Sequence, residues 1–335
     1  MLEAYAPQGA ADGAPRRPYV EYIRWLAAQD AERAARHWRA LLGDWSEPTP
    51  LPAGTGAADA GPGGRAIQAH ALGVEATAAL VALARRQHVT LNTLVQGAWA
   101  LLLARHSRRE EVLFGVTISG RPPDLPGVET MLGLFINTLP LRVDVRDAPL
   151  SEWLARLQQQ LVELQQFEAS PLYEVQRAAA LAPGAPLFES LVVFENYPVE
   201  VREPVSAAGL SIEDAVDVSH ANYPLALVAQ PGRQLALQLR YDTGRYDAPA
   251  IRRLLLQLER LLEGLASERA TCSSKSCGTV ACRGYGRVVS FQVSSCRRRS
   301  SSESGDSSAS RVARSDARPS SSRSSCSSSR RIAGA

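Results

Sequence analysis

The sequence predicts an α/β (α+β) two-layer sandwich, in which helices cover a sheet of at least five strands, followed by a disordered tail. Segments with apolar residues at helical spacing are interspersed with short runs rich in β-branched residues. The hydrophobic (45%) and charged (21%) fractions are those of a globular protein. The composition changes abruptly near Ala270, so we expect a short leading segment (1–18), a folded domain (19–270) and a tail (271–335).

The tail differs from the rest of the chain in charge and in residue types. It holds 12 Lys+Arg against 3 Asp+Glu, whereas residues 1–270 hold 25 against 31, so the domain is mildly acidic. All five cysteines lie in the tail, and its low apolar content predicts disorder. Three interpretations are open: a basic arm for nucleic acid, a metal site from Cys272, Cys277 and Cys282, or out-of-frame sequence. The cysteine spacing matches no common zinc motif, which weakens the second. We favour the third, because the chain switches abruptly to Ser, Arg and Cys where the last predicted helix ends.

The expected location is the cytoplasm. No stretch reaches the ~20 apolar residues that a membrane span needs, and the start "MLEAYAPQGA" lacks the layout of a signal peptide. A domain without cysteine needs no disulfide.

The first half of the domain is predicted to be mainly helical. One helix is expected over 19–43, with apolar residues near helical spacing and Gly43 at its end. The glycine-rich stretch 53–64 predicts a flexible loop. The elements expected next are a strand over 66–72, a helix over 74–87, a buried helix capped by Thr90, and a strand over 111–120 buried on both faces.

The second half is predicted to alternate between strands and helices. Leu139, Leu141 and Val143 alternate with Pro140, Arg142 and Asp144, which is typical of a half-buried strand. The remaining expected elements are an amphipathic helix over 149–167, a strand over 187–198, a hairpin of 223–230 and 234–242 around Pro231-Gly232, and a helix over 249–265.

General catalytic signatures are missing from the sequence. It has no GxxxxGK[ST], GxGxxG, HExxH or GxSxG motif. His37, His88 and His106 fall late in predicted helices, where a solvated or dipole-satisfying histidine is the simpler interpretation, and His70 is expected on an exposed strand face. His220 is less easily dismissed, because it precedes a strand near Asn222 and Tyr223.

Several segments together resemble condensation domains of nonribosomal peptide synthetases. "YVEYIRWLAAQD" resembles their Tyr-x-Asp-(Phe/Tyr)-x-x-Trp segment, with Glu21 in place of Asp. "TISGRPPDLPGVETMLGLFINTLPLRV" resembles their Ser-Gly-Arg segment and the Gly-x-Phe-(Val/Ile)-Asn-Thr motif that follows it. "FEASPLYEVQR" resembles the His-x-x-x-Pro-(Phe/Leu) motif, with Phe167 in place of His or Asn, and "GAPLFESLVVFENYP" resembles the Pro-Leu-Phe segment. The order of these segments is also that of the family.

The resemblance implies the fold of chloramphenicol acetyltransferase: two lobes, each a mixed sheet flanked by helices, with a reaction channel between them. It implies peptide-bond formation, in which the amine of one carrier-bound aminoacyl thioester attacks the thioester of another acyl group. The implied partners are acyl or peptidyl carrier proteins and other synthetase modules. The phosphopantetheine arms of the carriers would deliver the substrates, with no cofactor bound to this chain.

The resemblance also implies a set of channel residues. These are Ser119, Gly120, Arg121, Gly133, Phe135, Asn137 and Thr138, with His220, Asn222 and Tyr223 as further candidates. Gly133 would let the backbone come close to its neighbour, and Asn137 would aim its amide at the channel. The alternative for Asn137 is that its amide only satisfies the backbone of its own loop.

The family's catalytic His-His-x-x-x-Asp-Gly motif has no counterpart, since no two histidines are adjacent in the chain. We therefore expect a fragment that covers the C-terminal lobe and is inactive alone, with no catalytic and no metal-binding residue assigned. A second hypothesis is a non-catalytic docking lobe for a carrier protein or module, which an acidic domain disfavours because carriers are usually acidic. A basic-tailed nucleic-acid binder is a third. An exposed inter-lobe face predicts self-association.

Overall fold

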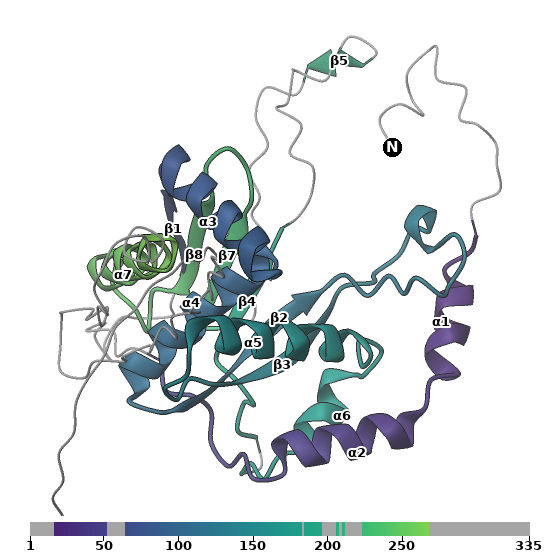
Figure 1. Ribbon diagram of the computed structural model, residues 1–335. Coiled ribbons are helices and arrows are strands. Elements are labelled where there is room, and N and C mark those ends of the chain that lie inside the picture. The colour runs from purple at the N-terminus through teal and green to yellow at the C-terminus, as the bar shows by residue number, and fades with distance from the viewer. Residues whose placement is uncertain are drawn as a thin grey trace, which may run out of the picture. The chain divides into compact units, whose positions relative to one another are not determined.

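The computed structural model describes residues 17–51, 64–182, 184–195, 206–207, 210–211 and 223–267, all within one compact unit, Met1–Ser294. Its centre is a six-stranded sheet with the order β1-β8-β7-β4-β2-β3 (Figure 1). The strands of this sheet are β1 (Arg65–Ala71), β2 (Glu111–Ile118), β3 (Asn137–Asp144), β4 (Ser190–Phe194), β7 (Leu225–Gln230) and β8 (Ala236–Asp242). The short strands β5 (Ser206–Ala207) and β6 (Leu210–Ser211) pair separately. The predicted tail lies outside the described residues.

The sheet is mixed, as predicted. Strand β4 runs parallel to both of its neighbours, β2 and β7. The outer pairs β2–β3, β7–β8 and β1–β8 are antiparallel. Strand β2 is buried along its middle, as its run of apolar residues predicts for a strand covered on both faces.

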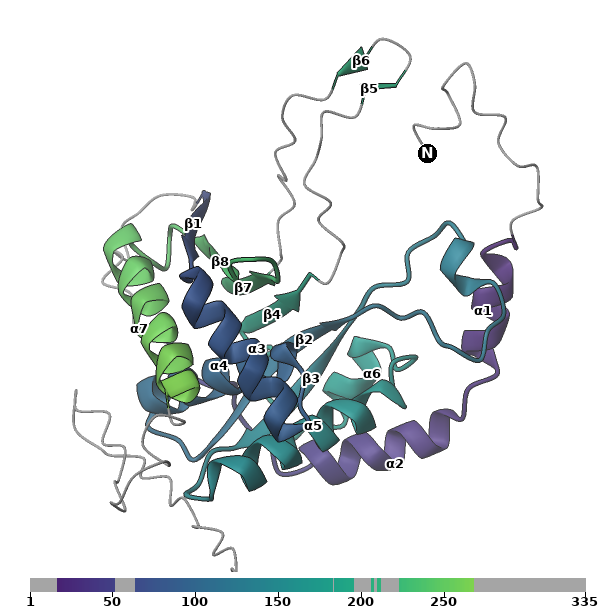
Figure 2. The same ribbon diagram turned by 45° about the horizontal axis from the view of Figure 1, so that its top comes forward.

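Four helices form a layer against the sheet (Figure 2). They are α3 (Val74–Gln87), α4 (Leu91–Ser107), α5 (Leu150–Gln165) and α7 (Ala248–Ser267). Helix α4 contacts the other three, and its residues Thr93–Ala104 are all buried, which confirms the prediction of a buried helix. Thr90 caps it, since its hydroxyl oxygen accepts a hydrogen bond from the amide of Thr93 at 3.1 Å. This fold confirms the predicted α+β architecture.

The prediction of one helix over 19–43 is wrong. The chain forms α1 (Val20–Ala27) and α2 (Ala31–Leu42), and Asp30 begins the second helix by accepting from the amide of Arg33 at 2.8 Å. The two helices bury their apolar faces in different clusters. Tyr22 of α1 lies in a small cluster, whereas Trp38 and Leu42 of α2 lie in the main core. One continuous helix could not bury Tyr22 in the small cluster and also bury Trp38 and Leu42 in the main core.

Other expectations differ in detail. The strand expected over 187–198 is shorter, and two elements were not predicted. These are a six-residue helix, α6 (Leu172–Arg177), after α5, and the 3-10 turn Val128–Thr130, between β2 and β3. His70 is half-buried rather than exposed, because its Nε2 lies 2.8 Å from Oε1 of Glu259 on α7. The hairpin β7–β8 is confirmed, with Leu237, Leu239 and Tyr241 buried on one face.

The other face of the sheet near β3 is covered by the end of α2. Arg142 lies on the face opposite Leu141, and its guanidinium donates to the carbonyl of Leu41 at 2.8 Å. It also bonds the carboxylates of Asp44 and Glu111, at 2.6 and 2.5 Å. These contacts fix the position of α2 relative to the sheet. None of the helices in the described ranges is long and apolar enough to cross a membrane.

Candidate functional site

Most of the predicted channel residues lie in the excursion Ser119–Ile136, which leaves the sheet after β2 and returns at β3. The excursion packs on α1 and forms a second hydrophobic cluster, separate from the main core. The buried members of this cluster are Tyr22, Leu125, Val128, Met131 and Phe135, with Tyr19, Trp25 and Leu26 packed against them. The structure thus brings Gly120, Arg121, Gly133 and Phe135 together, although they are up to 15 positions apart in the sequence.

Two glycines allow this close packing. A Cβ atom on Gly133 would lie 2.1 Å from Cδ2 of Tyr19, so only glycine fits against that ring. The Tyr19 hydroxyl donates to the carbonyl of the next residue, Leu134. Gly120 has a φ of +60°, and a Cβ there would lie 1.8 Å from the carbonyl oxygen of Phe135. The expected close approach at Gly133 is present, and the neighbour is an aromatic side chain.

Arg121 and Phe135 are engaged with each other inside the excursion. The Arg121 guanidinium carbon lies 4.0 Å from the centroid of the Phe135 ring, a cation–π contact. The same guanidinium donates to the carbonyls of Val128 and Met131. Phe135 is 4% exposed and packs edge-on against Tyr19, with ring centroids 5.2 Å apart. Both side chains therefore order the excursion, while Ser119 is exposed.

The Asn137 side chain joins the start of β3 to the loop before α6. Its Nδ2 donates to the carbonyls of Glu168 and Ser170, each at 2.8 Å, and its Oδ1 accepts from the amide of Thr138 at 2.8 Å. All the hydrogens of this amide are thus used within the protein. The loop that it satisfies is 31 to 33 residues away, rather than its own. Thr138 is half-buried beside it.

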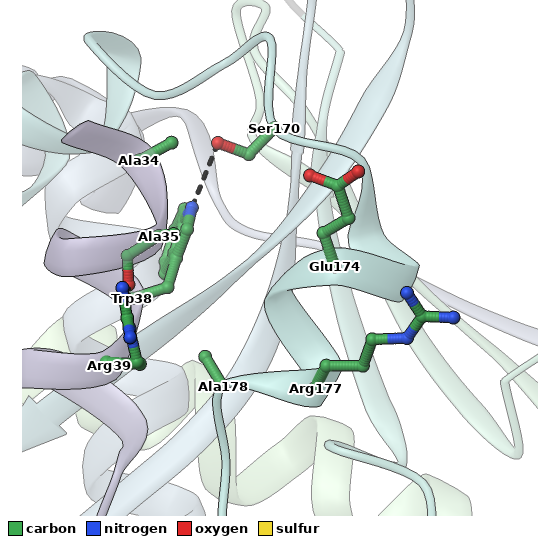
Figure 3. A pocket seen from close by; sticks show the side chains of 8 residues that line it. All are labelled: Ala34, Ala35, Trp38, Arg39, Ser170, Glu174, Arg177 and Ala178. Atoms are coloured by element: carbon green, nitrogen blue, oxygen red, sulfur yellow. Dashed lines mark hydrogen bonds between the residues drawn. The ribbon is translucent and has the colours of Figure 1, made fainter. Parts of the chain in front are cut away.

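Ser170 links Asn137 to a cavity between α2 and α6. The Ser170 hydroxyl accepts a hydrogen bond from Nε1 of Trp38 at 2.9 Å (Figure 3). The Ser170 carbonyl accepts from Asn137. The cavity has a volume of about 350 Å³, within the usual range of small-ligand and side-chain pockets. A polar residue at the start of β3, Asn137, therefore holds one wall of this cavity in place.

Titratable groups next to Asn137 have perturbed pKa values. Burial raises the pKa of Glu168, and the nearby Asp124 raises it further. Burial also raises the pKa of Tyr22, with contributions from Tyr19 and Glu168. Trp25 Nε1 donates to Asp124 at 3.2 Å. Glu168 is thus a carboxyl that holds its proton more readily than usual beside the predicted channel residues.

His37 is not the solvated histidine that its position in the sequence suggested. Its ring stacks on Phe167, with ring centroids 3.8 Å apart and an interplanar angle of 12°. Burial lowers its pKa. Phe167, which occupies the position of the family's His or Asn, therefore offers an apolar ring and no hydrogen bond.

Of the three further candidates, only Tyr223 is among the described residues. His220 and Asn222 lie outside the described residues. Tyr223 stacks on Phe188 with ring centroids 5.1 Å apart, just before β7, which is separated from β3 by β4 and β2. Within the described ranges, no three His, Cys, Asp or Glu side chains come together as metal ligands would.

Sequence reasoning missed the partners of the motif residues. Tyr19 meets Leu134 across 115 positions, and Trp38 meets Ser170 across 132. The only signal for these contacts was that Tyr19 and Ser170 lie in segments that resemble family motifs. Tyr19 begins "YVEYIRWLAAQD", and Ser170 precedes Pro171 in "FEASPLYEVQR".

The fold defines the class first: an α+β domain with helices against a mixed six-stranded sheet. The family model "Condensation domain" matches residues 3–276. A linear gramicidin synthase protein from Brevibacillus parabrevis is 45% identical over 258 residues, 74% of this chain and 5% of that protein. Chondramide synthase cmdD from Chondromyces crocatus is 39% identical over 253 residues, 74% of this chain and 6% of that protein.

A solved structure shows the same fold. The condensation domain from the monacolin K polyketide synthase MokA superposes with a TM-score of 0.58 at 18% identity, covering 70% of this chain and 57% of the other. The chain therefore belongs to the condensation domain family. It spans about one-twentieth of the length of the linear gramicidin synthase protein that it matches.

Proposed function

We propose that this chain takes part in peptide-bond formation between carrier-bound thioesters, as the C-terminal lobe of a condensation domain. The observation that carries the proposal is the family match over residues 3–276. The identity to synthetase proteins over about three quarters of the chain supports it. In this reaction the amine nitrogen attacks the thioester carbonyl carbon, the carbon–sulfur bond breaks, the thiol of the donor arm leaves, and the nitrogen loses a proton.

The excursion and the loop before α6 would supply one wall of the reaction channel. Asn137 would act by holding residues 168–170 in place, since its amide is already bonded to their carbonyls. The carbonyl oxygen that becomes negative during the reaction must be stabilised, and none of the chain's own histidines forms the family's His-His pair. We therefore propose that a histidine-bearing N-terminal lobe completes the catalytic site.

The partners in this proposal are two carrier proteins, whose phosphopantetheine arms bring the acyl and aminoacyl groups. The apolar side chains of Leu132, Leu134 and Ile136 are 58%, 75% and 54% exposed on the excursion. They would contact the N-terminal lobe, and in its absence they would favour self-association of the chain.

The test is amide formation between two loaded carrier proteins, followed by mass spectrometry of the arms. The full chain is assayed alone, with a separately purified N-terminal lobe that carries His-His-x-x-x-Asp-Gly, and the lobe is assayed alone. We expect product only in the mixture of chain and lobe. Product from the chain alone would show that the histidine is dispensable, and absence of product from the mixture would contradict the proposed function.

A further inference from the structure

The cavity between α2 and α6 has an apolar interior. Three alanines leave the space open, and the indole of Trp38, which is 2% exposed, contributes to its wall (Figure 3). The full lining comprises Ala34, Ala35, Trp38, Arg39, Ser170, Glu174, Arg177 and Ala178. An apolar group would therefore fit the interior of this cavity better than a small ion.

The wall of the cavity is fixed before anything binds. Trp38 is held by its hydrogen bond to the Ser170 hydroxyl, and Ser170 is held by Asn137 and by its own amide, which donates to the Phe167 carbonyl at 2.9 Å. A preformed pocket loses little conformational entropy when it is filled. The cavity is thus suited to accept a side chain as an anchor.

The rim of the cavity is basic, although residues 1–270 as a whole are acidic. Of the charged residues in the lining, Arg39 of α2 and Arg177 of α6 are basic and Glu174 is acidic, and Arg39 is exposed. Arg177 is exposed on α6, and Figure 3 shows its guanidinium directed away from Trp38.

One carboxylate, Glu174, also belongs to the lining. It accepts a hydrogen bond from the Tyr173 hydroxyl at 3.0 Å, and the Arg177 guanidinium carbon lies 5.5 Å from the Tyr173 ring centroid. The described residues provide no carboxylate ion pair for Arg39 or Arg177. These two exposed guanidinium groups are therefore accessible to the carboxylates of another molecule.

We propose that the α2–α6 groove docks an acidic amphipathic helix of a partner protein. An apolar side chain of that helix enters the cavity beside Trp38, and its carboxylates lie against Arg39 and Arg177. An apolar centre with a charged rim is the usual anatomy of a helix-in-groove contact. A free small anion fits less well, because the cationic groups lie at the rim and the interior is apolar. The proposal goes beyond the proposed function, since it requires no catalysis.

The test uses the full chain and a labelled helical peptide of about 15 residues, with glutamates on one face around a single leucine. Fluorescence anisotropy gives the Kd for this peptide, for its glutamate-to-glutamine analogue and for its leucine-to-alanine analogue. We expect both analogues to bind at least about tenfold more weakly. Equal binding of the neutral analogue, or no binding of the acidic peptide, would overturn the proposal.

Two variants of the chain locate the binding. We expect the double variant Arg39→Glu, Arg177→Glu to weaken binding about tenfold or more. The matched control reverses two exposed arginines on other helices, Arg85→Glu with Arg252→Glu, and should change the Kd by less than about twofold. Equal losses in the two double variants would overturn the proposal.

A third variant, Ala34→Leu, fills the cavity without changing charge. It should weaken the acidic peptide as strongly as the leucine-to-alanine analogue does, and unchanged binding would contradict the anchor. Urea midpoints show whether each variant is folded, and if the rim variant is not, Ala34→Leu decides. Peptide binding is also measured in inorganic phosphate and in chloride at the same ionic strength. Displacement of the peptide by phosphate but not by chloride would assign the groove to a free anion and overturn the proposal.

Discussion

Replacing Asn137 by alanine tests the central structural contact of the candidate site. The substitution removes two hydrogen bonds of 2.8 Å from Nδ2 to the carbonyls of Glu168 and Ser170. It also removes the 2.8 Å bond that Oδ1 accepts from Thr138. Because Ser170 in turn holds the Trp38 indole, the loss should also loosen the packing of α2 near α6.

The expected cost follows from these bonds. Each contributes about 1 kcal/mol net, and a half-buried carbonyl left without a partner costs about as much again. We expect Asn137→Ala to lower the free energy of unfolding by about 2–4 kcal/mol, a large share of the ~5–15 kcal/mol of a typical domain. Asn137→Asp should cost more at neutral pH, because a carboxylate would then face two carbonyl oxygens.

The assay is urea unfolding of the full chain, followed by tryptophan fluorescence and far-UV circular dichroism. The matched control is Asn92→Ala, which removes a single side-chain bond, the 2.8 Å contact from Gln96 to Asn92 on α4. We expect the control to cost about 1 kcal/mol or less. A loss at Asn137 no larger than the loss at Asn92 would refute the role that we assign to this amide.

Three further outcomes are expected. Gly133→Ala should destabilise the chain by about 1–3 kcal/mol, because the added Cβ would meet the Tyr19 ring. The control is Gly264→Ala in α7, where the added Cβ would have no neighbour within 4 Å, and it should stabilise the chain by about 0.5–1 kcal/mol. Equal urea midpoints for the two variants would contradict this. Tyr19→Phe should lower the urea midpoint and raise the proteolysis rate of the excursion, since the bond to Leu134 is lost; unchanged values would contradict it. Glu168→Gln should raise the free energy of unfolding at pH 7, because the pKa of Glu168 is raised in the folded state and the ionised carboxylate therefore costs stability above that pKa. This gain should vanish as the pH falls below the pKa of glutamate in the unfolded chain, about 4.3. A gain that grows at low pH would contradict the sign.

Local patterns predicted most elements because helices and strands repeat with different periods. The alternation of Leu237, Leu239 and Tyr241 identified β8, and Thr90 identified the start of α4. The break at Asp30 was missed, although no large apolar residue lies between Leu26 and Trp38, because the alanines and charged residues between them also suit a helix. Only the tertiary structure shows that the two helices pack into different clusters.

The order of the strands could not be read from the sequence. Strand β1 pairs with β8 at one edge, although about 170 residues separate them, and β4 inserts between β2 and β7. Such pairings depend on which faces meet in space. The motif residues were identified by resemblance, but their contacts were not, because Asn137 meets a loop that follows α5 rather than its own loop.

The role proposed for Asn137 in the channel wall is tested most directly by the single-turnover rate of amide formation in the mixture of chain, histidine-bearing lobe and two loaded carriers. Asn137 holds residues 168–170 through its two bonds to their carbonyls. We therefore predict that Asn137→Ala, at a temperature where the variant is folded, slows the reaction by about tenfold or more, because small displacements of positioning groups cost this much. A rate for Asn137→Ala equal to that of the unmodified chain would contradict this role.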